Sequence, residues 1–201
     1  MIQLVKRAMK SDTDAFLELM ERNSLAMYKV ARGILNNDED AADAIQDTIL
    51  TCFEKLHTLK KPEYFRTWMI RILINECNSI RRHYSNLNLQ EDFADIPQSD
   101  VSIAEFEFKE MLETVDEKYR VVLILHYVEG FKLSEIAAIL ELNENTVKTR
   151  IARARQQLRE AYADTPPASS RKVTYYSDAD RKGEGQNEQT ERFHFIRSTF
   201  G

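Results

Sequence analysis

The hydrophobic residues of this chain recur at steps of three and four positions, which is the spacing of one face of an α-helix. In the N-terminal half, this pattern predicts helices over residues 2–10, 12–35, 40–57 and 63–83. The pattern stops in the polar stretch 85–100, which contains Pro97, and it resumes from Val101 to about Tyr162. We therefore expect two helical blocks separated by a linker.

Turn-forming residues are scarce: the 201 residues include only 5 Gly and 4 Pro. A sheet of many short strands would need more of them, so we predict an all-α fold with two small helical domains joined by a flexible acidic linker. The expected parts are a first domain over 1–84, a linker over 85–101, a second domain over 102–163 and a disordered tail over 164–201.

The sequence contains no run of eighteen apolar residues, and its first residues lack the long apolar stretch of a secretory signal. Cys52 and Cys77 lie inside helical patterns, away from any Cys-x-x-Cys motif, and are interpreted as buried thiols in a reducing compartment. We expect a cytoplasmic protein that does not insert into a membrane.

The net charge of −5 argues at first against a nucleic-acid partner, but the charges are unevenly distributed. Residues 91–105 hold five acids and no Lys or Arg, whereas residues 148–159 hold five cations and no acid. A basic helix and an acidic connector are therefore hidden in the average.

The predicted helix over 40–57 has one apolar face, formed by Ala41, Ile45, Thr48, Ile49, Cys52 and Leu56. Asn37 or Asp38 is expected to cap it. The opposite face is acidic but includes Leu50. This residue indicates either a protein partner or a solvated face with one stray apolar residue, and spacing alone leaves both open.

The predicted helix over 63–83 begins beside Pro62, which a first turn tolerates. Its expected buried face is Phe65, Met69, Ile72, Leu73 and Ile80. A second stripe holds Trp68, Arg71, Asn75, Asn78 and Arg82. An aromatic ring, amides and cations on one side suit single-stranded nucleic acid, because bases stack on the ring and cations meet phosphates. The alternative is a half-buried Trp flanked by solvated residues.

Residues 133–158, LSEIAAILELNENTVKTRIARARQQL, give the strongest local pattern. A short apolar helix, a break at 141–143, the N-cap residue Asn143 and a second helix predict a helix-turn-helix. The second helix would project into a major groove through Glu144, Asn145, Lys148, Thr149, Ala152 and Arg153. Its flanking cations Arg150, Arg155 and Arg159 would face phosphates.

The other interpretation is an ordinary helical hairpin with a basic face. Glu141 occupies a turn position that often requires Gly, which predicts either a less left-handed turn or mild strain.

These motifs resemble a known family. LSEIAAIL followed by TVKTRIARARQQL is similar to the promoter-binding region 4 of bacterial sigma factors, and DEKYRVVLILHYVEGFKLSEIA at 116–137 resembles the helices before it. DEDAADAIQDTIL at 38–50 and FRTWMIRILINECNSIRR at 65–82 resemble region 2. The short linker, with no region 3 domain, is similar to the extracytoplasmic-function class.

The resemblance implies a transcription initiation factor that binds core RNA polymerase. It implies that Asp43, Gln46, Asp47 and Leu50 dock on the clamp helices of the largest polymerase subunit. It implies roles in melting and reading the minus-ten element for Trp68 and Asn75, supported by Arg71, Asn78, Arg81 and Arg82. The groove-facing residues of the second motif would read the minus-thirty-five element, and many relatives are held by an anti-sigma factor.

Three other functions remain possible. A stand-alone helix-turn-helix regulator would explain residues 133–158 but neither the Trp68 stripe nor Leu50. An enzyme is disfavoured because the four His are scattered and no nucleophile, metal or phosphate-loop motif occurs, so we expect no catalytic residue, metal, cofactor or small-molecule substrate. The third is a module that only sequesters a partner. The tail from Thr165 ends in RFHFIRSTF, a possible partner-binding segment.

Overall fold

The structure is a computed structural model that describes residues 1–35, 37–86 and 114–161. The predicted linker lies almost entirely, and the tail wholly, outside these residues. The helical elements are α1 (Ile2–Ala8), α2 (Thr13–Ile34), α3 (Asp38–Lys55), η1 (Leu56–Thr58), η2 (Pro62–Tyr64), α4 (Phe65–Asn86), α6 (Glu117–Leu123), η3 (Ile124–Val128), α7 (Leu133–Leu140) and α8 (Glu144–Ala161). The described residues contain no strand, and the all-α prediction is confirmed.

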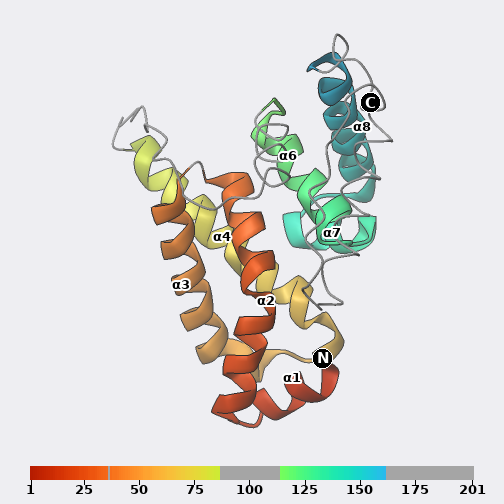
Figure 1. Ribbon diagram of the computed structural model, residues 1–201. Coiled ribbons are helices and arrows are strands. Elements are labelled where there is room, and N and C mark those ends of the chain that lie inside the picture. The colour runs from red at the N-terminus through yellow and green to blue at the C-terminus, as the bar shows by residue number, and fades with distance from the viewer. Residues whose placement is uncertain (36, 87–113, 162–201) are drawn as a thin grey trace, which may run out of the picture.

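The N-terminal block, residues 1–86, is a bundle in which α2, α3 and α4 pack against one another, with α1 across one end of α2 (Figure 1). The predicted apolar face of α3 is buried or half-buried throughout. The core contribution of α4 is wider than predicted, because Ile70, Ile74 and Cys77 are buried as well. The helix contacts α2 and α3 in this block and α7 in the other, so it buries more than one stripe.

Side-chain caps determine where the long helices begin. Asp12 accepts a hydrogen bond from the Ala15 amide at 2.9 Å and starts α2, and Asn37 accepts one from the Asp40 amide at 2.7 Å and starts α3. Of the two residues predicted to cap this helix, Asn37 is therefore the one that caps it. Pro62 begins a short 3-10 turn rather than the α-helix itself, and α4 continues to Asn86, beyond the predicted end at 83.

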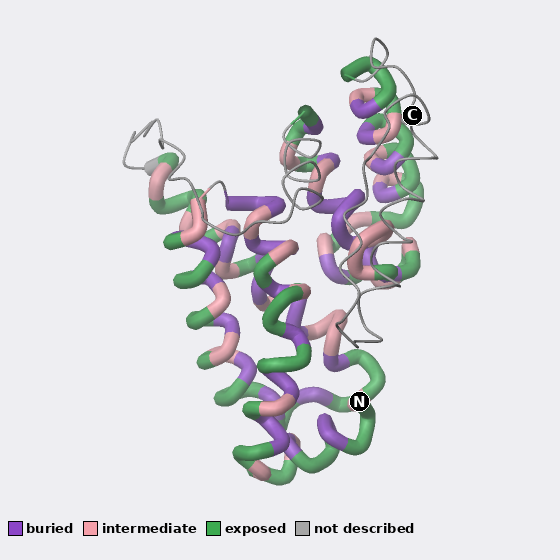
Figure 2. The backbone as a smooth tube through the Cα atoms, viewed as in Figure 1, coloured by how far each residue is buried: buried purple, intermediate pink, exposed green. Residues whose placement is uncertain are grey.

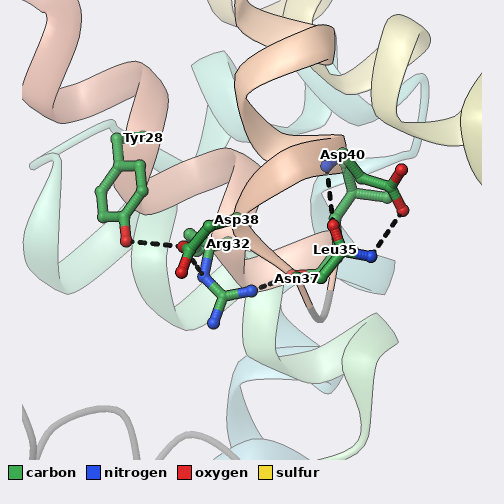
Figure 3. A network of polar contacts seen from close by, with 6 residues as sticks. All are labelled: Tyr28, Arg32, Leu35, Asn37, Asp38 and Asp40. Carbon is green, nitrogen blue, oxygen red and sulfur yellow. Dashed lines mark hydrogen bonds and ion pairs between the residues drawn. The ribbon is translucent and has the colours of Figure 1, made fainter. Parts of the chain in front are cut away.

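A polar network holds the corner between α2 and α3 (Figure 3). Asp38, in the first turn of α3, accepts a hydrogen bond from the Tyr28 hydroxyl at 2.8 Å and pairs with Arg32 Nε at 2.9 Å. Arg32 also donates to the Leu35 carbonyl at 3.3 Å. Because Tyr28 and Arg32 both belong to α2, the network sets the direction in which α3 leaves the corner.

The C-terminal block, residues 114–161, consists of α6, the π-helical turn η3, α7 and α8. The Asn143 side chain accepts from the Thr146 amide at 2.7 Å, as expected of the cap of α8. The apolar residues of α8 that recur at steps of four, three and four are all buried: Val147, Ile151, Ala154 and Leu158. The apolar face of α7 that helical spacing predicts is buried at Ile136 and Ala137 and half-buried at Leu133 and Leu140. Ile139 is buried as well, because α7 contacts α4 in addition to α8.

The two blocks pack directly against each other, which the sequence did not predict. Contacts join α4 to α7 and α2 to α6, and the buried residues of both blocks form one continuous cluster (Figure 2). Gly33 of α2 lies so close to Ile124 that a Cβ at position 33 would stand 2.2 Å from the Ile124 Cδ1 atom. Within the described ranges, no helix is both long and apolar enough to cross a membrane.

Candidate nucleic-acid interface

The outer face of α8 carries the residues predicted to enter a major groove. All six are exposed, on the side of the helix opposite its buried stripe: Glu144, Asn145, Lys148, Thr149, Ala152 and Arg153. The short α7 and the turn before Asn143 place this face at the surface of the C-terminal block (Figure 1). The geometry is that of a helix-turn-helix whose second helix presents its polar side outward.

Two arginines of α8 also bond within their own block. Arg153 donates to the Tyr119 hydroxyl of α6 at 3.2 Å, and this hydrogen bond lowers the pKa of Tyr119. Arg155 donates through Nε to the Tyr127 hydroxyl at 2.8 Å, and its guanidinium lies 5.5 Å from the centre of that ring. Arg155 is half-buried as a result, and its predicted phosphate contact stays a prediction.

The turn between α7 and α8 is left-handed at Glu141, with φ 55° and ψ 41°. The expectation of a less left-handed turn is therefore wrong, and the expectation of strain is the one that fits. A residue with a Cβ in this conformation costs about 1 kcal/mol, which Gly would avoid. The Glu141 side chain is paired with Arg71 of α4, so it has a use that Gly could not supply.

The predicted stripe on α4 has an aromatic residue at one end and cations along its length. Trp68 is half-buried, and its ring centre lies 6.2 Å from that of Phe65, which belongs to the core. Asn75 and Arg82 are exposed, whereas Asn78 is half-buried. The stripe therefore combines a supported aromatic face with exposed amide and guanidinium groups, the chemistry that binds single-stranded nucleic acid.

Two arginines of α4 that are predicted to support reading of the minus-ten element are paired with glutamates of the other block. Arg71 pairs with Glu141, and Arg81 pairs with Glu117 of α6. Arg81 also donates to the Asn78 side-chain oxygen at 3.2 Å. The alternative interpretation was a half-buried Trp flanked by solvated residues. It does not account for Arg71 and Arg81, because both are paired with glutamates.

The predicted polymerase-binding residues lie on the outer face of α3. Asp43, Gln46 and Asp47 line an open hollow between α3 and α4, together with His83 and other residues of α4. Leu50 follows along the same helix and is 55% exposed. The face thus places carboxylates and an amide next to an exposed apolar side chain.

Several residues of these surfaces, and of the contact between the blocks, were not predicted from the sequence. Phe53 lies one turn beyond Leu50 and is 60% exposed, and the i, i+3 spacing of two large apolar residues on an acidic face could have revealed it. Gly33 is an isolated glycine inside a helical pattern, which often marks close packing. The pairing of Arg66 with Glu129 at 3.0 Å has no sequence signal, because the two residues lie 63 positions apart.

The described residues hold neither a metal-binding cluster nor a thiol that ionises easily. They contain no group of His, Cys, Asp or Glu side chains able to hold a metal ion. Burial raises the pKa of both Cys52 and Cys77 to about 12, so these thiols stay protonated at neutral pH.

Comparison with protein families decides what these surfaces belong to. The sigma-70 region 2 model matches residues 19–86, which include α3 and the whole of α4, and the sigma-70, region 4 model matches residues 105–158, which include the helix-turn-helix. The chain belongs to the extracytoplasmic-function sigma factors. It is a transcription initiation factor, and the stand-alone regulator is not favoured.

Relatives of this sigma factor match over most of its length. RNA polymerase sigma factor SigV of Bacillus subtilis (strain 168) is 29% identical over 136 residues, covering 66% of this chain and 81% of that protein. ECF RNA polymerase sigma factor SigW of the same strain is 26% identical over 178 residues, covering 80% and 95%.

Solved structures of sigma factors have a similar arrangement of helices. CnrH in complex with the cytosolic domain of CnrY matches with a TM-score of 0.62 and 25% identity, over 82% of this chain and 98% of that one. The sigma factor RpoE in complex with the anti-sigma factor NepR from Bartonella quintana matches with a TM-score of 0.61 and 25% identity, over 74% and 99%.

Proposed function

We propose that this sigma factor binds core RNA polymerase in the cytoplasm and directs it to promoters through two separate DNA-reading faces. The outer face of α8 reads the duplex minus-thirty-five element, and the Trp68 stripe of α4 opens and reads the minus-ten element. The chain itself has no catalytic role; the polymerase supplies the chemistry. The observation that carries this proposal is the exposure of all six groove-facing side chains of α8 on a chain that also holds the Trp68 stripe.

The two faces suit different forms of DNA. A helix with exposed Lys148, Thr149 and Arg153 can meet base edges in a major groove, which admits an α-helix. A half-buried tryptophan next to exposed Asn75 suits an unpaired base instead, because the ring offers a stacking surface and the amide can bond a base edge. Flipping a base out of the duplex costs a few kcal/mol, which such a preformed surface offsets.

Charge supports a factor that reads DNA as part of a larger complex. With a net charge of −5 and one basic helix, the free protein neutralises few phosphates and is expected to bind duplex DNA weakly. On the polymerase, both readers would be held near their elements, which raises their effective concentration without new contacts.

The polymerase-binding surface in this proposal is the acidic face of α3. Asp43, Gln46 and Asp47 provide polar contacts to the clamp helices of the largest subunit, and Leu50 provides the apolar centre. We assign Phe53 to the same surface because it is exposed one turn along the helix. The solved structure of the sigma factor RpoE in complex with the anti-sigma factor NepR supports a regulator of that kind for this chain too.

The test is transcription of a promoter library by core polymerase with and without the purified protein. We expect discrete start sites that appear only when the factor is present, preceded by shared minus-ten and minus-thirty-five sequences. A library without any factor-dependent start site would refute the proposed function.

A matched pair of leucine variants tests the polymerase-binding surface. Leu50→Asp should weaken core binding at least tenfold, because an apolar contact worth about 2 kcal/mol is replaced by a charge. Leu25→Asp changes a similarly exposed leucine on α2, 47% exposed, and should leave core affinity unchanged. Equal loss in both variants would contradict the assignment to α3.

A further inference from the structure

The outer side of α3 is an acidic surface with an apolar centre. Leu50 and Phe53 are its large apolar side chains, 55% and 60% exposed and one turn apart. Exposed carboxylates and an amide surround them, and Lys55 is the only cation among the residues of this helix. We call this surface the α3 face, which consists of Glu39, Asp43, Gln46, Asp47, Leu50, Phe53 and Glu54.

The centre of the α3 face is held in place from below. The Phe53 ring meets the Phe16 ring of α2 edge-on, with 5.2 Å between the ring centres. Phe16 is buried, so one edge of Phe53 is anchored in the bundle while the rest of the ring is exposed. An anchored aromatic side chain loses little conformational freedom when a partner covers it, which favours binding.

The hollow beside this centre has the electrostatics of a cation site for a side chain. Three aspartates line it, and neither Lys nor Arg is among the lining residues. Asp40 already accepts hydrogen bonds from the Tyr84 hydroxyl at 2.9 Å and from the Asn37 amide nitrogen at 2.8 Å. Asp43 and Asp47 are exposed at the rim, where an incoming guanidinium can reach them.

A second pair of exposed apolar residues has neighbours of the opposite charge. Leu25 and Tyr28 also lie one turn apart, on α2, and are 47% and 38% exposed. Their neighbours at helical spacing include Arg22 and Lys29, and the Tyr28 hydroxyl donates to Asp38. A basic apolar ligand would therefore be repelled from this pair and attracted to the α3 face.

The chain contains a segment with the complementary composition. Residues 192–200, RFHFIRSTF, hold three Phe, one Ile, two Arg and one His, and no acid. We call them the basic segment. They lie outside the residues that the structure describes and outside the family matches at 19–86 and 105–158. Their apolar side chains suit Leu50 and Phe53, and their two guanidinium groups suit the surrounding carboxylates.

The length of chain before the basic segment permits it to reach α3. Thirty residues, 162–191, separate it from the end of α8. Such a length spans at most about 100 Å, whereas a folded unit of this size has a radius of gyration of about 14 Å. A tethered ligand acts at an effective concentration of the order of millimolar, so a short segment with weak contacts can still occupy its site.

We propose that the basic segment docks on the α3 face of its own chain and competes there with core polymerase. Its Phe and Ile side chains cover Leu50 and Phe53, and Arg192 and Arg197 pair with carboxylates of the face. The inference rests on the proposed function, because the α3 face is the surface assigned to core polymerase. Only the fraction of molecules with an uncovered face can bind core, so docking lowers the apparent affinity by that fraction.

The first experiment locates the basic segment in the full-length protein without polymerase. A benzophenone photo-cross-linking residue replaces Phe195, and the cross-linked monomer is digested and analysed by mass spectrometry. We expect the cross-link to join the segment to the part of α3 that contains Leu50 and Phe53. The same probe at Tyr176 is the control and should not favour α3. Cross-links to other helices, or to a second copy of the chain, would overturn the proposal.

Reversal of charge on both sides tests whether the arginines face the carboxylates. Arg192→Glu with Arg197→Glu should lower the yield of the Phe195 cross-link about fivefold, because like charges then meet at the α3 face. Adding Asp43→Lys and Asp47→Lys to the same chain should restore the yield. A yield that ignores the first pair of changes, or is not restored by the second, contradicts the proposed pairing.

The second experiment measures competition as the affinity for core polymerase. The segment variant and its control each lose three apolar side chains without a change of charge, and both keep the described residues intact. The segment variant carries Phe193→Ser, Phe195→Ser and Ile196→Ser, and the control carries Val173→Ser, Tyr175→Ser and Tyr176→Ser. We expect the segment variant to bind core about tenfold more tightly than the wild type, as for a face covered about nine-tenths of the time. The control should bind like the wild type.

The outcomes separate this inference from the proposed function. If the segment variant binds core like the wild type while Leu50→Asp weakens binding, the basic segment does not compete, and only the inference fails. If neither variant changes core affinity, the α3 face is not the polymerase-binding surface, and that assignment fails as well. Equal gains in the segment variant and its control would also overturn the inference, because the effect would not belong to residues 192–200.

Discussion

Helices α4 and α8 are both proposed to contact DNA, yet their arginines have partners in different parts of the chain. The arginines of α8 that form hydrogen bonds with other side chains do so inside their own block, Arg153 with Tyr119 and Arg155 with Tyr127. On α4, Arg71 and Arg81 pair with glutamates of the opposite block. The cations of a helix proposed to bind DNA can thus be engaged either within their own block, as on α8, or by the opposite block, as on α4.

The difference also shows what each helix needs from its surroundings. The groove-reading face of α8 depends on a local turn and a core that α6 and α7 provide. The face of α4 contacts the other block, so its accessibility depends on where that block lies. The outer face of α8 is therefore exposed once its own block folds, whereas Arg71 and Arg81 of α4 are paired across the contact between the blocks.

The largest effect is expected at the minus-ten face. Trp68→Ala with Asn75→Ala should reduce open-complex formation by polymerase about 100-fold, because loss of one stacked base costs about 1–3 kcal/mol and loss of an amide contact adds to it. Permanganate reactivity of unpaired thymines measures the opening. Tyr64→Ala, which removes an exposed aromatic residue just before α4, is the matched control and should open promoters normally.

A smaller effect is expected at the minus-thirty-five face. Lys148→Ala with Arg153→Ala should reduce initiation at promoters that need the upstream element about tenfold or more, while core binding stays intact. Tyr119→Phe removes the hydroxyl that Arg153 contacts but keeps the guanidinium, and should change initiation little. If Tyr119→Phe were as damaging as the arginine change, Arg153 would act through its own block and the contrast between the helices would weaken.

The smallest effect concerns the exposed pair that joins the helices. A double-mutant cycle with Arg71→Ala and Glu141→Gln should give a coupling of about 0.2–1 kcal/mol in the free energy of unfolding, as for other exposed pairs. In the Arg71→Ala background, Glu141→Gly should stabilise the protein by about 1 kcal/mol, since the strained turn no longer serves a pairing. Chemical denaturation measures both quantities, and destabilisation by Gly would show that the left-handed turn is not strained.

Local features of this protein could be predicted from the sequence because their causes are local. The buried stripe of α8 follows from residues at steps of three and four, and Asn143 is a cap because its side chain reaches an amide only three residues away. The apolar face of α3 and the exposure of Leu50 follow from the same periodicity. These features needed no knowledge of the rest of the chain.

Features with causes distant in sequence could not be predicted in this way. A single apolar stripe does not include Ile70 and Ile74, which are buried in the structure. One stripe suffices for a helix with neighbours on one side, whereas α4 has neighbours in both blocks. Exposed ion pairs do not recur at a regular spacing in the sequence. The residues near Arg71 or Arg81 therefore do not indicate a partner glutamate that lies 70 or 36 positions away.

The sequence by itself determined the helices, their caps and the chemistry of their faces, because hydrogen bonds and side-chain contacts within a few residues decide these. Only the tertiary structure decided which faces are available. Whether Arg71 meets solvent or a carboxylate depends on the close approach of α2 to the C-terminal block at Gly33 and on the left-handed turn that directs Glu141. Both are long-range packing effects, which residues close in sequence do not determine.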